Sequence, residues 1–91
     1  MSALNEHFLK DLEKYWHCEV RDASSGTDLL RALNHPGHLI SARDFRDSLA
    51  SAIERRSFSV AEYESVTGLD CESADEVAED LQGLWRMMDG I

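Results

Sequence analysis

Residues 73–88 read SADEVAEDLQGLWRMM, and this stretch decides the fold class. Its large apolar residues recur at steps of three and four positions, which places them on one face of a helix. They are Val77, Leu81, Leu84, Trp85 and Met88. Ser73 followed by Glu76 has the spacing of a capping box, in which the serine hydroxyl accepts from a free backbone N–H and the acid reaches back. The stretch therefore predicts a helix that begins after Ser73 and buries its apolar face.

Two further capping boxes precede it, at residues 41–44 and 59–62. Ser41 opens a predicted helix that ends at Arg55 and Arg56, where cations suit the negative end of the helix dipole. Ser59 opens a shorter predicted helix that ends at Gly68. Phe58 directly precedes Ser59, the place of a hydrophobic staple residue.

The first forty residues predict two more helices. Apolar residues from Leu4 to Trp16 form one stripe at helical spacing. Residues 21–26 are polar and without periodicity, which predicts a loop. Thr27 or Asp28 then caps a short helix that residues 34–37 terminate, because proline cannot continue the hydrogen-bond ladder. Tyr15 and Trp16 are adjacent and about 100° apart on a helix, so one of them is expected at the rim of the core.

These elements predict an all-α fold, a compact bundle of four to five short helices in one domain spanning residues 1–91. A chain of 91 residues is long enough for one core without disulfide staples. The other aromatic residues fall on the predicted inner faces: Phe8, Phe45, Tyr63 and Trp85.

The net charge of −9 excludes several classes of function. A nucleic-acid binder shows a basic patch, and a lipid-surface anchor shows a polybasic segment. No apolar run is long enough to span a bilayer, and the N-terminus lacks the pattern of a secretory signal. We therefore expect a cytoplasmic protein that contacts neither nucleic acid nor membrane directly.

The charge is concentrated in one part of the chain. Residues 1–56 carry nine acids and eight bases, whereas residues 57–91 carry nine acids and one base. Because consecutive elements joined by short loops lie close together, these acids are expected to form one patch. Such a patch fits a basic protein partner, since it speeds encounter through long-range attraction. The candidate partner-binding residues are Glu62, Asp70, Glu72, Asp75, Glu76, Glu79 and Asp80.

Metal, cofactor and catalytic sites are not predicted. His17, Cys18, His35 and His38 offer zinc-binding atoms but lack the usual paired spacing. The acids after Asp70 lack the glycine and the final glutamate of a calcium loop. Cys18 and Cys71 are expected as reduced thiols, with a disulfide as the alternative. No nucleophile elbow or phosphate loop is present, so we expect a protein that is not an enzyme.

Four short motifs carry a resemblance to a known family. They are Tyr15-Trp16, residues 41–45 (SARDF), residues 58–68 (FSVAEYESVTG) and Leu84-Trp85-Arg86. With them the chain resembles the small helical immunity proteins of bacterial contact-dependent growth inhibition systems. The resemblance implies a cytoplasmic protein that binds and neutralises the toxic C-terminal domain, often a nuclease, of its own system's toxin. It implies no particular contact residues, so those named above come from the charge pattern alone.

Other functions remain open at this stage. The same acids would suit a nucleic-acid mimic or small adaptor, such as a phage-type inhibitor of a host defence complex. A helical subunit of an obligate oligomer is a third interpretation. Neighbouring genes distinguish the immunity protein from the phage-type inhibitor, and measurement of molecular mass in solution tests the oligomer.

Overall fold

Five helices in the order α1 (Glu6–Tyr15), α2 (Ser25–Leu33), α3 (Ala42–Arg55), α4 (Val60–Thr67) and α5 (Ala74–Asp89) form the molecule. The structure is a computed structural model that describes residues 6–89. That part of the chain contains no β-strand, so the all-α prediction is confirmed. Leu4, which begins the predicted apolar stripe of the first helix, lies outside the described residues.

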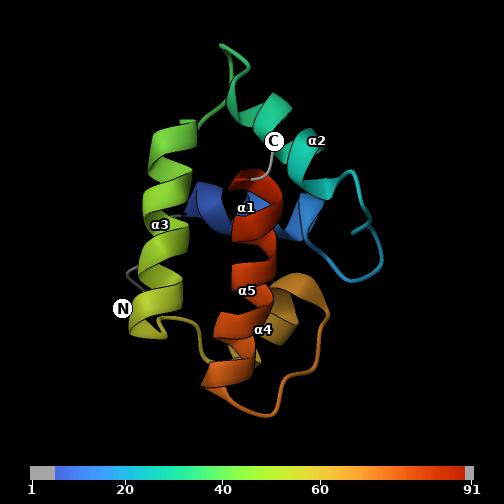
Figure 1. The fold of residues 1–91 in the computed structure, drawn as a ribbon, viewed down its shortest axis with the longest axis vertical. Helices are drawn as coiled ribbons and strands as arrows, with labels where there is room; N and C mark the ends of the chain where they lie inside the picture. Colours follow the sequence, from blue (N-terminus) through green and yellow to red (C-terminus); the bar gives the residue numbers. More distant parts are fainter. Residues whose placement is uncertain (1–5, 90–91) are drawn as a thin grey trace.

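The longest helices, α3 and α5, lie side by side and run in opposite directions (Figure 1). The helices α2 and α4 also contact α5, and α1 contacts both α2 and α4. The radius of gyration is 12.1 Å. A compact chain of this length is expected to have a radius of about 12 Å, so the helices close around a shared core.

The core consists of the apolar stripes that the sequence places on inner faces. On α5, Val77, Leu81 and Leu84 are fully or almost fully buried. Aromatic rings join the other helices, and the ring centroids of Phe8 and Phe45 are 4.9 Å apart. The complete cluster is Phe8, Leu12, Trp16, Leu29, Leu33, Ile40, Phe45, Leu49, Ala52, Phe58, Tyr63, Cys71, Val77, Leu81, Leu84 and Met88. Trp85 is only half-buried and packs against the edge of this cluster.

The three predicted capping serines all cap their helices. Ser59 forms the complete box: its hydroxyl accepts from the Glu62 N–H, and the Glu62 carboxylate accepts from the backbone N–H of Ser59. Ser41 accepts from the Asp44 N–H at 3.1 Å. Ser73 accepts from the Glu76 N–H at 3.3 Å. The Glu76 carboxylate accepts from the backbone N–H one residue before Ser73, at 2.7 Å, so the return bond is shifted by one position.

The predicted staple and helix ends are also confirmed. Phe58 is buried, and its ring packs against the Tyr63 ring in a T-shaped arrangement with a centroid distance of 5.3 Å. Arg56 and Gly68 end α3 and α4 in the left-handed conformation, with φ of 52° and 72°. Of the adjacent aromatic pair, Trp16 is buried and Tyr15 is half-buried at the rim, as expected.

The prediction for the start of α2 is wrong. The helix begins at Ser25, within the stretch predicted as a loop, and not after Thr27 or Asp28. Packing explains the difference, because Ser25 and Gly26 are buried. A Cβ added to Gly26 would lie 2.8 Å from Met87 Cβ, so only glycine lets the first turn of α2 approach α5 this closely. This contact joins segments that are distant in the sequence.

Candidate partner-binding surface

Six of the seven predicted partner-binding residues are exposed and lie on consecutive elements. Glu62 is on α4, Asp70 and Glu72 are in the loop before α5, and the rest are on the first turns of α5. We call these six the acidic surface: Glu62, Asp70, Glu72, Asp75, Glu76 and Glu79. Figure 1 shows α4 and the start of α5 at the same end of the molecule.

Some of these carboxylates also bond within the fold. Glu62 closes its capping box, and Glu76 binds the backbone N–H of Glu72. Asp75 Oδ1 accepts from Nε of Arg56 at 3.1 Å, in an ion pair with both side chains well exposed. The side chains of Asp70 and Glu79 have no bond to any residue in the described range 6–89, so their charges face solvent.

Asp80, the seventh predicted residue, is not exposed like the other six. Its side chain is only 20% exposed and points toward α1 and α4. Arg21 binds both carboxylate oxygens, through Nη1 at 2.8 Å and Nη2 at 3.1 Å. Tyr63 donates its hydroxyl to Oδ2, and Trp16 Nε1 lies 3.2 Å from the same oxygen. We call these four residues the Asp80 network.

The Asp80 network ties α4 and α5 to Trp16, which directly follows α1, and to Arg21 in the loop after it. Arg21 also donates to the Trp16 carbonyl oxygen, at 2.8 Å from Nη2 and 3.1 Å from Nε, and its guanidinium carbon lies 4.0 Å from the centroid of the Trp16 ring. Trp16 Nε1 also donates to the Tyr63 hydroxyl at 3.1 Å. No buried side-chain N or O atom of the described residues lacks a partner. Both oxygens of the Asp80 carboxylate therefore accept internal bonds, one at Oδ1 and three at Oδ2.

The electrostatics around the network agree with its geometry. Burial raises the pKa of Tyr63 well above its ordinary value, and the hydrogen bond to Asp80 and the Asp80 charge raise it further. Burial is the largest single effect on the pKa of Arg21 and lowers it, but the hydrogen bond to Asp80, the Asp80 charge and the interactions with Tyr63 together outweigh burial, so that pKa is raised. Burial raises the pKa of the Cys71 thiol, and the charges of Asp80, Glu76 and Asp70 add to the effect. Negative potential thus extends from the acidic surface to this cysteine.

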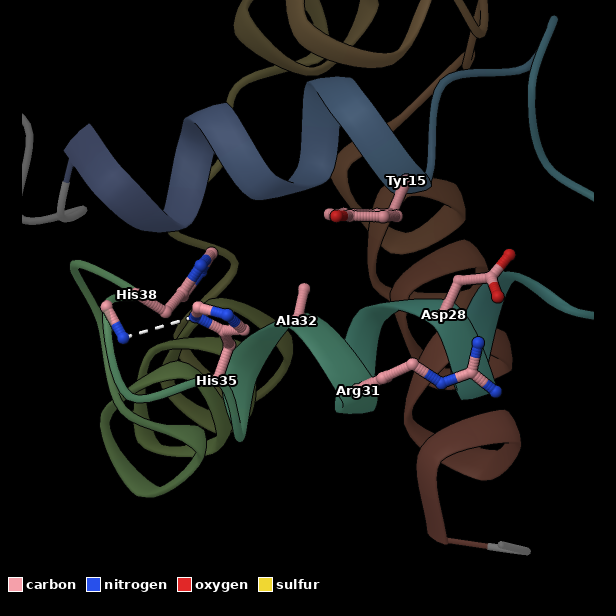
Figure 2. A pocket seen from close by; sticks show the side chains of 7 residues that line it. Tyr15, Asp28, Arg31, Ala32, His35 and His38 are labelled. Carbon is pink, nitrogen blue, oxygen red and sulfur yellow. Dashed lines mark hydrogen bonds between the residues drawn. The ribbon is translucent and has the colours of Figure 1, made fainter.

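Two open hollows lie away from the acidic surface. The first, of about 490 Å³, is lined by Tyr15, Asp28, Arg31, Ala32, His35, Gly37 and His38. Figure 2 shows Asp28 and Arg31 on α2 directed toward one another, below the Tyr15 ring at the end of α1. His35 Nδ1 accepts from the Gly37 N–H at 3.2 Å, and His38 Nε2 lies 2.9 Å from an oxygen of Asp11. The second hollow, of about 440 Å³, lies between α3 and α5.

Within residues 6–89, the cysteine and histidine side chains are not gathered into a site. Cys18 is exposed and Cys71 is buried, and both are free thiols. Within that range, no group of three or more histidine, cysteine, aspartate or glutamate side chains is arranged to hold a metal ion. None of the helices in the described part of the chain is both long and apolar enough to cross a bilayer.

The partners of Asp80 are not evident in the sequence. Trp16 and Tyr63 are separated by 47 positions, and Arg21 and Asp80 by 59. Arg21 lies in a polar stretch that carries no motif. The one signal in the sequence is the helical spacing that buries Trp16 and Tyr63, whose polar atoms need partners once buried.

Comparison with protein families, with curated proteins and with solved structures finds no match for this chain.

Proposed function

We propose that this chain is a small helical binding protein that neutralises a basic protein partner. In the specific form we favour, it is the immunity protein for the toxic C-terminal domain, a nuclease, of a contact-dependent inhibition toxin. The observation that supports this most is the acidic surface, six exposed carboxylates on α4, the next loop and the start of α5. The resemblance carried by the four sequence motifs points the same way.

The physical basis is electrostatic complementarity. Nucleases bind a polyanion, so their substrate clefts carry arginine and lysine side chains. An acidic protein surface facing such a cleft attracts it over a long range and occupies the place of the phosphates. Neutralisation in this form requires binding alone, so the proposal includes no cofactor, no metal and no chemical step. The cytoplasm, where the toxin would act, is the proposed location.

Asp80 has a positioning role in this proposal. Its carboxylate is bonded to Arg21, Tyr63 and Trp16, so a partner's cation would have to displace internal bonds to reach it. The network joins α5 to α4 and to Trp16, the residue that follows α1, and in this way fixes the relative positions of the elements that carry the acidic surface. The contacts to the partner are assigned to the six exposed residues.

The test combines the chain with the toxin domain encoded beside its gene. Co-expression is expected to restore growth, and titration calorimetry is expected to show a one-to-one complex that weakens as salt rises. In the decisive variant Asp70, Glu72 and Glu79 are changed to lysine, because these side chains form no bond to another residue in the described range. We expect affinity to fall by about 100-fold or more.

A matched control carries the same change in net charge elsewhere. It changes Glu13, Asp28 and Asp47, which are exposed on α1, α2 and α3, to lysine. Its affinity is expected to fall far less, since long-range attraction alone changes. Equal affinities for the two triple variants would contradict the assignment of the acidic surface. Failure of the toxin domain to bind the unchanged chain would contradict the proposed function itself.

A further inference from the structure

Arg56 brings a positive charge into the acidic surface. It directly follows α3, and its Nε donates to Asp75 Oδ1 at 3.1 Å. Asp75 belongs to the acidic surface, and Glu79 lies four positions further along α5, where side chains of one helix are neighbours. Figure 1 shows α3 ending at the end of the molecule where α5 begins. The arginine therefore lies among carboxylates that we assign to partner binding.

The backbone at Arg56 suits glycine better than arginine. Its φ of 52° is in the left-handed region, which is unfavourable for a residue with a Cβ but not for glycine. The next helix, α4, ends in the same conformation and has Gly68 at that position. The ion pair with Asp75 is well exposed, and such pairs contribute little to stability. The turn after α3 therefore does not by itself require an arginine.

The guanidinium of Arg56 is held in place, but most of its donors are free. Of its five N–H groups, the one on Nε donates to Asp75 and one on Nη1 donates to the carbonyl oxygen of Ile53. The others, including both on Nη2, form no bond to any residue in the described range. Because two internal bonds already fix the group, a partner that accepts from the free N–H groups loses little entropy in ordering this side chain.

A partner surface that carries only cations does not match this arrangement. Lysine or arginine opposite Arg56 would be repelled, since like charges facing one another across an interface are strongly unfavourable. A carboxylate opposite Arg56 instead accepts from the free N–H groups, and bonds between guanidinium and carboxylate are among the strongest hydrogen bonds in proteins. The complementary surface therefore combines cations, which face the six acids, with a carboxylate that faces Arg56.

We propose that Arg56 binds a catalytic carboxylate in the cleft of the toxin domain. Nuclease clefts combine the two features, because cations hold the phosphates while an aspartate or glutamate acts as a general base or holds a divalent metal ion. The acidic surface faces the cations of the cleft, and Arg56 faces the carboxylate. This inference rests on the proposed function and adds to it the group in the cleft that the chain recognises.

The sign of one substitution tests the inference. Arg56→Gly removes the positive charge and keeps the turn, because glycine adopts the left-handed conformation freely. If Arg56 faced cations, this change would tighten the complex with the toxin domain encoded beside the gene. Because Arg56 faces a carboxylate, the dissociation constant is expected to rise about 10-fold or more in titration calorimetry. Arg55→Gln removes the same charge from the preceding exposed residue and is expected not to weaken binding.

Substitutions in the toxin domain identify the carboxylate. Each aspartate or glutamate that the toxin domain needs for cleavage is changed to its amide, and a double-mutant cycle with Arg56→Gly measures the coupling between the two groups. One of these amides is expected to weaken binding of the unchanged chain about 10-fold and to leave binding of Arg56→Gly nearly unchanged.

The possible results separate this inference from the proposed function. The inference alone is overturned if Arg56→Gly binds as tightly as the unchanged chain or more tightly, or if no amide variant is coupled to Arg56. If the unchanged chain does not bind the toxin domain, the inference and the proposed function are both overturned. Far-UV circular dichroism confirms that each variant is folded.

Discussion

Replacement of Asp80 by alanine is expected to destabilise the protein by about 3 kcal/mol. The Tyr63 hydroxyl donates to Asp80, and without that acceptor a buried hydroxyl hydrogen has no partner, which costs about 2 kcal/mol. The ion pair with Arg21 is bidentate, but about a fifth of each side chain is exposed. Solvent screening therefore limits its contribution to about 1 kcal/mol. Trp16 keeps its bond to the Tyr63 hydroxyl, so it adds little.

This loss is large for a chain of this size. Small domains have unfolding free energies of about 0.05–0.15 kcal/mol per residue, which is about 5–14 kcal/mol here. For domains of this length, 1 kcal/mol corresponds to about 4–8 °C, so the midpoint temperature is expected to fall by about 12–24 °C. Urea unfolding followed by circular dichroism and by tryptophan fluorescence measures the free energy directly.

Glu79→Ala is the matched control for this prediction. Glu79 is the preceding residue on α5, is exposed and bonds to no residue of the described range. Glu79→Ala removes the same charge as Asp80→Ala. The difference in unfolding free energy between the two variants therefore separates the contribution of the network from the relief of acidic repulsion. Glu79→Ala is expected to change stability by no more than about 0.5 kcal/mol. If Asp80→Ala is no less stable than Glu79→Ala, the Asp80 network does not stabilise the fold and the reasoning is refuted.

Three further predictions follow from local geometry. Because the pKa of Tyr63 is raised in the folded state, the unfolded state loses that proton first, so stability is expected to fall as pH rises above about 10. Tyr63→Phe should flatten this fall in urea titrations across that range, and an unchanged slope, compared with Tyr15→Phe, would contradict the assignment. Gly26→Ala should cost about 1–2 kcal/mol in thermal unfolding, because its Cβ would lie 2.8 Å from a Cβ of α5. Gly83→Ala, whose Cβ would make an ordinary 3.9 Å contact, should instead stabilise α5 by up to about 1 kcal/mol. Changes in stability of the same sign for the two glycine substitutions would be inconsistent with this packing. Ser59→Ala removes one half of the complete capping box and should cost about 1 kcal/mol in urea unfolding, so full stability would show that the box contributes nothing.

The acidic surface shows what the charge pattern of the sequence predicts about the structure and what it does not. The sequence places Asp70, Glu72 and Glu79 in consecutive elements, and the structure leaves them exposed in the loop between α4 and α5 and on the first turns of α5. Asp80 lies in the same run of acids, yet its side chain points into the protein. The two sides of α5 differ because one faces Trp16 and Tyr63 while the other faces solvent. Helical spacing alone does not identify which flanking acid finds buried donors.

The five helices could be predicted from the sequence because their signals are local. Capping serines, apolar stripes and the helix ends at Arg56 and Gly68 depend on residues within a few positions of one another. The start of α2 could not be predicted from the sequence, since it depends on the contact between Gly26 and Met87, which are distant in the chain. The Asp80 network is of the same kind. It joins groups far apart in the chain, and only the packing of the helices brings those groups within bonding distance.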